Sequence, residues 1–143
     1  MVPFAGIVWH MIAAGTDPLR PAQAPEGRFH HSGQLALYTS LTVEGTQVAM
    51  KRYLGSDDPQ RHVVPLTIRA LRFADQRGNT AASVVWQDIH AAGATPPTWV
   101  HSDNARAMGA QGMLYSSRSR SDLTHLVLFD LSVIKAVGTA VPV

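Results

Sequence analysis

The sequence lacks cysteine and contains no long apolar run. Without cysteine, the chain of 143 residues has no disulfide and no thiolate ligand for a metal, which fits the reducing cytoplasm where we expect the protein to act. No apolar run approaches the roughly 18 residues of a membrane span, so we expect no membrane association. The apolar start MVPFAGIVWHMIAAG has no basic region and is interpreted as a strand rather than a signal peptide.

Carboxylates and the common catalytic motifs are also scarce. Glu26 and Glu44 are the only glutamates, so two-carboxylate glycosidase chemistry would have to draw on aspartates, which lie mostly in expected turns. The seven histidines include no pair spaced i,i+4, and we therefore expect no metal site. The GxSxG, P-loop and GxGxxG motifs are absent, which removes the usual signatures of serine hydrolases and nucleotide-binding folds.

Arginine dominates the cations that are present. Ten of the twelve basic residues are arginine, although the formal net charge is only +2. The planar guanidinium binds phosphate and carboxylate through two parallel hydrogen bonds. The only basic cluster is the short RSR at 118–120, so we expect no direct nucleic-acid binding. Arginine, tyrosine, histidine and serine around few acids indicate a phosphorylated ligand that carries a ring.

Hydrophobic periodicity and turn residues predict a single α+β domain over residues 1–143. The predicted strands span residues 7–12, 34–39, 62–72, 112–115 and 124–131. The predicted helices span 42–53 with Thr42 as the N-cap, 81–92, and 102–108 with Gly109 as the C-cap. Pro65 predicts an edge or a bulge in its strand, and VGTAVPV at the end predicts a frayed tail.

One turn carries more chemistry than a fold requires. GRFHHSG at 27–33 places an arginine, a phenylalanine and two histidines between glycines, and ALYTS at 36–40 follows it. Together with TWVHSDNARAMGAQGMLYSSRSR at 98–120 and THLVLFDL at 124–131, these blocks resemble the RES-domain toxins of bacterial toxin–antitoxin modules. The resemblance extends over about residues 7–131, which is nearly the whole chain.

The resemblance implies an ADP-ribosyltransferase-like fold, with a split, mostly antiparallel sheet and short helices, that binds NAD in a cleft. Members of the family degrade NAD by hydrolysis or phosphorolysis, or transfer its ADP-ribose to a protein. They are typically encoded with an Xre-type helix-turn-helix antitoxin, so the expected partners are NAD and such an antitoxin in a hetero-oligomer. DNA contact would then belong to the antitoxin.

The family motifs match individual residues of this chain. By resemblance, Arg28 would hold the NAD pyrophosphate, Tyr38 would pack on or bond the nicotinamide ribose, and Ser117 would bond phosphate or ribose. Phe29 replaces the usual tryptophan or tyrosine and would offer a ring to the ligand. His30 stands where asparagine is common, and is also a candidate contact. Arg118, in the serine loop, is a further candidate for the phosphates.

The family glutamate has no direct counterpart. Most members place it eleven residues after the tyrosine, and Ala49 occupies that position here. Glu44, in the first turn of the same predicted helix, is the candidate replacement, although five residues separate the two by about 140° beyond a full turn and about 7.5 Å of rise. The acid is therefore relocated, dispensable or lost.

Three functions remain open at this point. The first is a toxin that cleaves NAD at the nicotinamide–ribose bond with Arg28, Tyr38, Glu44 and Ser117 as the catalytic set. The second is an ADP-ribosyltransferase that modifies a host protein at the same NAD site. The third is a catalytically decayed module that retains only the antitoxin-binding surface.

Overall fold

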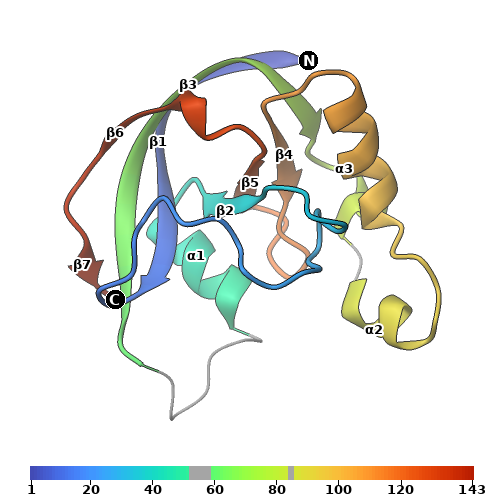
Figure 1. The fold of residues 1–143 in the computed structure, drawn as a ribbon, viewed down its shortest axis with the longest axis horizontal. Helices are drawn as coiled ribbons and strands as arrows, with labels where there is room; N and C mark the ends of the chain where they lie inside the picture. Colours follow the sequence, from blue (N-terminus) through green and yellow to red (C-terminus); the bar gives the residue numbers. More distant parts are fainter. Residues whose placement is uncertain (52–58, 84–85) are drawn as a thin grey trace.

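The computed structural model describes residues 1–51, 59–83 and 86–143. Five of its strands pair in a closed ring in the order β1-β2-β5-β4-β3, with β3 returning to β1 (Figure 1). The strands are β1 Val2–Ala13, β2 Leu37–Ser40, β3 Arg61–Gln76, β4 Gly112–Ser116 and β5 Thr124–Leu128. Among these pairs only β3–β4 is parallel, so the predicted mostly antiparallel sheet is confirmed.

The ring is closed rather than split into two halves. Strands β1 and β3 form its long arm, paired from Val2 opposite Phe73 to Ala13 opposite Arg61. On the other side β1 meets β2 through a single residue pair, Trp9 opposite Ser40. The expectation of a split sheet missed this closure because β1 pairs with two strands, and the β1–β2 contact is too short to leave a pattern in the sequence.

The C-terminal residues were expected to fray, and this prediction is wrong. They form β6 Ile134–Val137 and β7 Val141–Pro142, which both pair with the outer edge of β3. β3 changes partner at Pro65, whose carbonyl accepts the backbone N–H of Gly138 at 2.8 Å. Proline has no N–H to donate, and its place at this changeover confirms the predicted irregularity.

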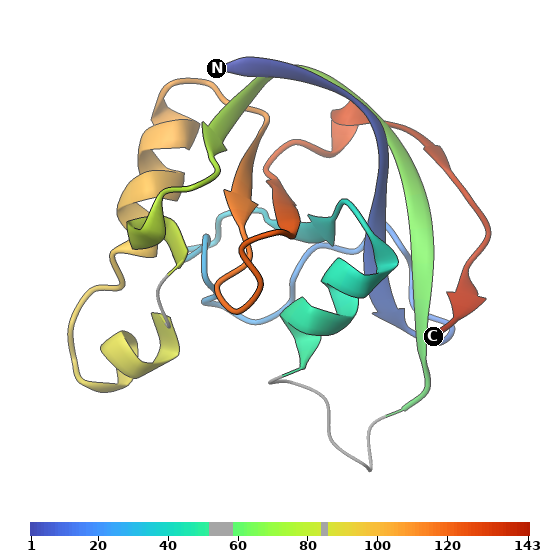
Figure 2. The ribbon, with the colours of Figure 1, turned by 180° about the vertical axis from the view of Figure 1, so that it is seen from behind.

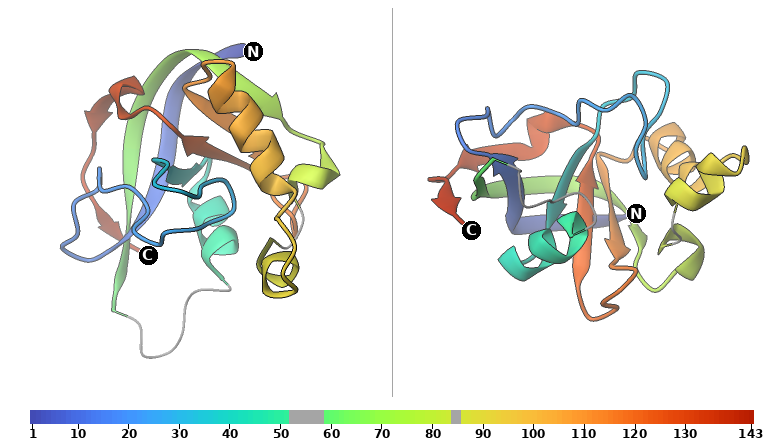
Figure 3. Two further views of the ribbon diagram at one scale, coloured as in Figure 1. Left: turned by 45° about the vertical axis from the view of Figure 1, so that its right-hand side comes forward. Right: turned by 90° about the horizontal axis from the view of Figure 1, so that it is seen from below.

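Short helices cover the ring. They are α1 Val43–Met50, α2 Trp86–Ala91 and α3 Thr98–Ala107, with 3₁₀ turns η1 Thr80–Ser83 and η2 Leu131–Val133. Figure 2 shows α1 between the β1–β3 arm and the loop that joins β4 to β5, whereas Figure 3 shows α3 on the side of the ring away from β6 and β7. In the described ranges no helix has the length and apolar character needed to cross a bilayer.

The predicted helix boundaries hold in part. Thr42 caps α1 as expected, since its hydroxyl accepts the backbone N–H of Gly45 at 2.9 Å. The predicted end of that helix near Tyr53, with the turn that follows it, lies outside the described residues. α3 begins at Thr98 rather than at Ser102, and the predicted helix over 81–92 is replaced by η1 and the short α2. Gly109 follows α3 with a φ of +79°, which confirms it as the terminating glycine.

Two apolar clusters fill the molecule. The larger lies between the long arm and β5, and includes Val8, Leu66, Phe73 and Leu126. The smaller lies beneath α3 and contains Phe29, whose side chain is completely buried. Burying a phenylalanine side chain contributes about 1.5–3 kcal/mol. Phe29 therefore anchors the turn at 27–33 in the core, which fixes the position of the turn relative to the sheet.

Candidate functional site

The Tyr38 hydroxyl holds the turn from the side of β2. It accepts the backbone N–H of Phe29 at 2.9 Å and donates to Nδ1 of His30 at 2.7 Å. Nε2 of His30 in turn donates to the carbonyl of Ala24 at 2.8 Å. Burial raises the pKa of Tyr38 well above its ordinary value, so the phenol stays protonated and the chain of donors is consistent. Gly27 precedes this chain, and a Cβ there would meet the His30 ring.

Helix α3 holds the same turn from the opposite side. Nε1 of Trp99 donates to the carbonyl of Gly27 at 2.8 Å, and the Arg106 guanidinium donates to the carbonyls of Phe29 at 2.8 Å and Leu35 at 2.9 Å. Trp99 and Arg106 are seven residues apart and therefore lie on one face of the helix. Backbone carbonyls of the turn that would otherwise be unpaired near the core are satisfied in this way.

Tyr38 on one side and α3 on the other thus clamp the turn at 27–33. His31 and Ser32 belong to this clamp and do not form a hydrolytic triad. Nε2 of His31 lies 2.9 Å from an oxygen of Asp103, Nδ1 lies 2.8 Å from the Ser32 hydroxyl, and the ring stacks on Trp99 with centroids 4.5 Å apart. Ser32 has a φ of +53°, and the backbone N–H of Gln34 donates to the His31 carbonyl, which closes a tight turn. His31, Ser32 and Asp103 are absent from the linings of the two pockets described below, and their contacts fix the turn on α3.

The clamped turn presents Arg28. Its side chain is half-buried, and among the described residues it has no hydrogen bond or ion pair. Its positive charge nevertheless acts on a neighbouring group, because after burial it is the next cause that lowers the pKa of His125. An unpaired guanidinium held by a rigid turn is a binding group for an anion such as a phosphate.

A buried serine–histidine pair lies within the field of Arg28. The Ser40 hydroxyl and Nδ1 of His125 are 2.6 Å apart, on the neighbouring strands β2 and β5. Burial, followed by the charge of Arg28, lowers the pKa of His125 to about 4. The imidazole is therefore neutral at physiological pH, and the charge of Arg28 acts on a neutral serine–histidine pair.

A pocket of about 200 Å³ opens beside this pair. Its walls come from β1, the loop before the turn, β2, α1 and β4, and they include His10, Arg20, Tyr38, Ser40, Ala49 and Tyr115. Tyr38 is thus one predicted site residue that lines the pocket. Ala49, where the resemblance places the family glutamate, also lines it and contributes a methyl group.

The other predicted site residues lie outside this lining. Glu44 is exposed and accepts a hydrogen bond from the Arg120 guanidinium at 2.9 Å. Ser117 is buried, and its oxygen accepts the backbone N–H of Arg120 at 3.3 Å, which leaves its own hydroxyl hydrogen available. Arg118 is exposed on the same loop.

Phe29 and His30 differ from the expectation of ligand contacts. Phe29 packs edge-on against Tyr115 with centroids 4.6 Å apart and is completely buried. His30 is 3% exposed and both of its ring nitrogens are bonded to protein groups. Neither side chain has a free face or atom for NAD, and both instead support the backbone that carries Arg28.

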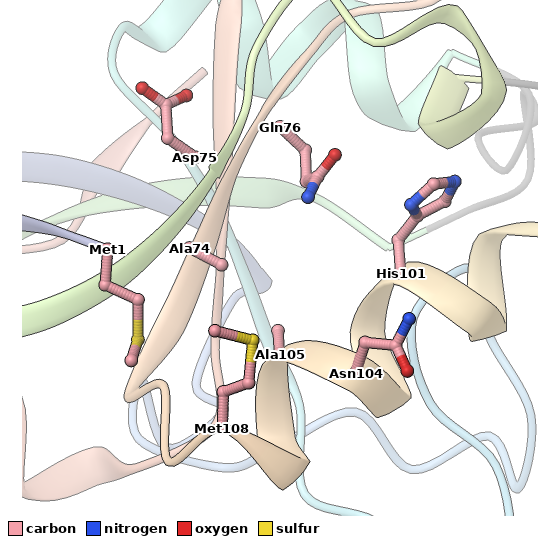
Figure 4. A pocket seen from close by; sticks show the side chains of 8 residues that line it. All are labelled: Met1, Ala74, Asp75, Gln76, His101, Asn104, Ala105 and Met108. Atoms are coloured by element: carbon pink, nitrogen blue, oxygen red, sulfur yellow. The ribbon is translucent and has the colours of Figure 1, made fainter.

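A second pocket, of about 220 Å³, is separate from the first and shares no lining residue with it. Figure 4 shows it between the end of β3 and α3, with Asp75, Gln76, His101 and Asn104 around it. A bond from Arg77 lowers the pKa of Asp75, so the carboxylate there is ionised and already paired. None of the candidate site residues named from the resemblance lines this pocket.

Sequence reasoning missed four residues of the site. Trp99 and Arg106 were overlooked because α3 was expected to begin at Ser102, which hid the shared face. His10 and His125 each stand alone among apolar neighbours in a strand, IVWHMI and THLVLF. A single polar residue inside an apolar strand is a signal for a buried polar contact, and it was available in both places.

Comparisons with known proteins agree with the fold. A family model described as the RES domain matches residues 7–142. Among solved structures, the chain is similar to a chain in the MbcT–MbcA toxin–antitoxin complex of M. tuberculosis, with a TM-score of 0.67 and 14% sequence identity, covering 99% of this chain and 86% of that chain. At this identity the likeness shows a shared fold. No curated protein matches the sequence.

Proposed function

The chain belongs to the RES-domain family, and from that premise we propose that it is the toxin of a bacterial toxin–antitoxin module that cleaves NAD at the nicotinamide–ribose bond. The observation that carries the proposal is Arg28, a guanidinium with no partner among the described residues, on a turn clamped between α3 and Tyr38, which also lines the pocket of about 200 Å³. NAD needs both elements, a cation for its pyrophosphate and a pocket for its nicotinamide ring.

The size of the pocket suggests which part of NAD binds in the pocket and which part binds Arg28. Sites for drug-sized ligands typically span about 300–1,000 Å³. The pocket of about 200 Å³ takes only part of a dinucleotide. We assign it the nicotinamide riboside end, against the rings of Tyr38 and Tyr115, and assign the pyrophosphate to Arg28 with Ser117 and Arg118 as further donors.

The chemistry needs few acidic groups. When the bond between the ribose C1′ and the pyridinium nitrogen breaks, its electron pair goes to the nitrogen and nicotinamide leaves as a neutral ring. No general acid is required for this departure, whereas positive charge develops on the ribose. A site without a carboxylate at position 49 can therefore still support the reaction, at the cost of a group worth roughly 10²–10³ in rate.

The fold supports a protein partner for the toxin. The similar solved structure comes from a toxin–antitoxin complex, and we propose a corresponding hetero-oligomer here, with an Xre-type antitoxin that makes the DNA contacts. The ADP-ribosyltransferase-like character of the fold is part of the same proposal. The presence of Ala49 in the pocket favours the catalytically decayed binding module as the second candidate.

The test is NAD consumption by the purified chain, followed by HPLC with and without phosphate. We expect the wild type to consume NAD and Arg28→Ala to lose about 10–100-fold, because a hydrogen bond to a charged group contributes about 1.5–3 kcal/mol. Arg69→Ala, at an exposed arginine on β3, is the matched control and should behave as wild type. The product identifies the acceptor: free ADP-ribose for water, its phosphate ester for phosphate.

Other results would contradict the proposal. Label from NAD appearing on protein, without free product, would establish the transferase. A chain that binds the antitoxin but neither consumes NAD nor labels protein would establish the decayed module. Equal activity in Arg28→Ala and wild type would show that the clamped arginine is not the phosphate ligand.

A further inference from the structure

His10 reaches the pocket from β1 in a defined tautomer. Its Nδ1 lies 2.8 Å from the backbone carbonyl of Tyr38. A carbonyl oxygen only accepts, so Nδ1 carries the hydrogen and the neutral ring has its lone pair on Nε2. In the described part of the chain Nε2 has no hydrogen-bond partner, and His10 belongs to the lining of the pocket. The basic Nε2 atom therefore lies on the opposite side of the ring from the hydrogen bond that Nδ1 makes.

The surroundings keep this histidine neutral. Burial lowers the pKa of His10, and the bond to the Tyr38 carbonyl offsets this only in part. The other titratable side chains of the pocket are Arg20 from the loop, Tyr38 from β2 and Tyr115 from β4. Helix α1 contributes Thr46, Ala49 and Met50, none of which titrates. Among the described residues of the pocket lining, the titratable neighbours are a cation and two phenols, and none is a carboxylate that would stabilise the protonated ring.

No other described group of the pocket can accept a proton near neutral pH. Arg20 is a permanent cation, and the Tyr38 phenol stays protonated because burial raises its pKa. Glu44 is exposed and bound to Arg120 outside the lining, while Ala49 has replaced the family acid. His10 is therefore the base that this pocket retains.

We propose that His10 is the catalytic base of the site, whose Nε2 takes the proton of the water that attacks the ribose. The inference rests on the proposed function and names its acceptor. The C1′–nitrogen bond breaks with its electrons going to nicotinamide, and a bond forms between the water oxygen and C1′. The released proton goes to Nε2, and the imidazolium then returns it to solvent.

The decisive variant is His10→Asn, because an asparagine amide can keep the N–H that donates to the Tyr38 carbonyl while deleting Nε2. We expect kcat for NAD hydrolysis to fall by about 10²–10⁴, the usual contribution of a general base. NAD affinity, measured by calorimetry, should change little. His62→Asn, at a histidine on β3 outside the pocket, is the matched control and should retain wild-type kcat.

The dependence of kcat on pH tests the role of His10 further, because a residue with only a structural role would not change this profile. Burial lowers the pKa of His10, so wild-type kcat should fall only at a pH below the ordinary histidine value of about 6.5, where protonation removes the base. That acid limb should vanish in His10→Asn, and added imidazole should restore part of the activity of His10→Ala. These measurements use the wild type and a second variant, so a poorly folded His10→Asn does not decide the outcome.

The assays distinguish a failure of the proposed role of His10 from a failure of the proposed function. If the wild type consumes NAD while His10→Asn stays within about threefold with the same acid limb, the role of His10 is overturned and the proposed function stands. If NAD is lost only by phosphorolysis, with a kcat independent of pH over this range, water is not the acceptor and the inference is overturned. A wild type that does not consume NAD overturns both.

Discussion

The Tyr38 hydroxyl lies 2.7 Å from Nδ1 of His30 and so joins β2 to the turn that carries Arg28. The same oxygen accepts the backbone N–H of Phe29, which leaves it no free donor for a ligand. Tyr38 therefore contributes its ring face to the pocket, whereas its hydroxyl positions the turn.

Tyr38→Phe should therefore destabilise the protein more than its small size change suggests. The substitution leaves Nδ1 of His30 and the N–H of Phe29 without partners in a buried setting, which costs about 1–3 kcal/mol. We expect the melting temperature, measured by circular dichroism, to fall by roughly 3–10 °C. Arg28→Ala should melt within about 1 °C of wild type. A Tyr38→Phe protein as stable as wild type would show that the hydroxyl does not hold the turn.

Arg106 should act on NAD binding without touching NAD. Its guanidinium bonds the carbonyls of Phe29 and Leu35 and lies over the Phe129 ring, 4.0 Å from the centroid. Arg106→Gln should loosen the turn and raise KM for NAD about tenfold with a smaller change in kcat, and hydrogen exchange should increase at 27–35. Arg69→Gln is the control. An unchanged KM together with unchanged exchange would rule out the clamp.

His125 should make stability depend on pH in the acid range. Its folded pKa, about 4, lies below the ordinary histidine value of about 6.5, so the unfolded chain binds more protons between these values. Stability from this group is complete above pH 6.5 and is lost as pH falls toward 4, by up to about 3 kcal/mol. Thermal unfolding between pH 4 and 7 should show a shallower slope for His125→Asn than for wild type. Parallel slopes would contradict the neutral buried imidazole.

The elements that the sequence predicted well are those with local signals. Alternating residues marked β2, the Thr42 hydroxyl marked the start of α1, and Gly109 marked the end of α3. Each depends on a few neighbouring residues, and periodicity or capping chemistry is sufficient to find it.

What the sequence did not predict depends on distant pairs. Ser40 and His125 are 85 positions apart and meet only because β2 pairs with β5, while Trp99 and Gly27 are 72 apart. Ring closure through one β1–β2 residue pair has no pattern of its own. Arg28 was found by its unusual neighbours, but the burial of Phe29 and His30 beneath it follows from the contact of the turn with α3 and β4.

Glu44 and Ala49 provide a contrast on one helix. Glu44 is exposed, bound to Arg120, and outside the pocket lining, so Glu44→Gln should retain NAD consumption within about threefold of wild type. Ala49 lines the pocket, and Ala49→Glu should place a carboxylate near the developing positive charge on the ribose. A group of that type is worth roughly 10²–10³ in rate, and even a poorly oriented one should raise kcat several-fold.

Steady-state NAD assays of the two variants decide between a lost and a relocated acid. A large loss in Glu44→Gln with no gain in Ala49→Glu would mean that the surface carboxylate turns inward to the substrate when NAD binds. Activity retained in Glu44→Gln and raised in Ala49→Glu would mean that the wild-type chain works without an acid at either position, because position 49 contributes only a methyl group to the pocket.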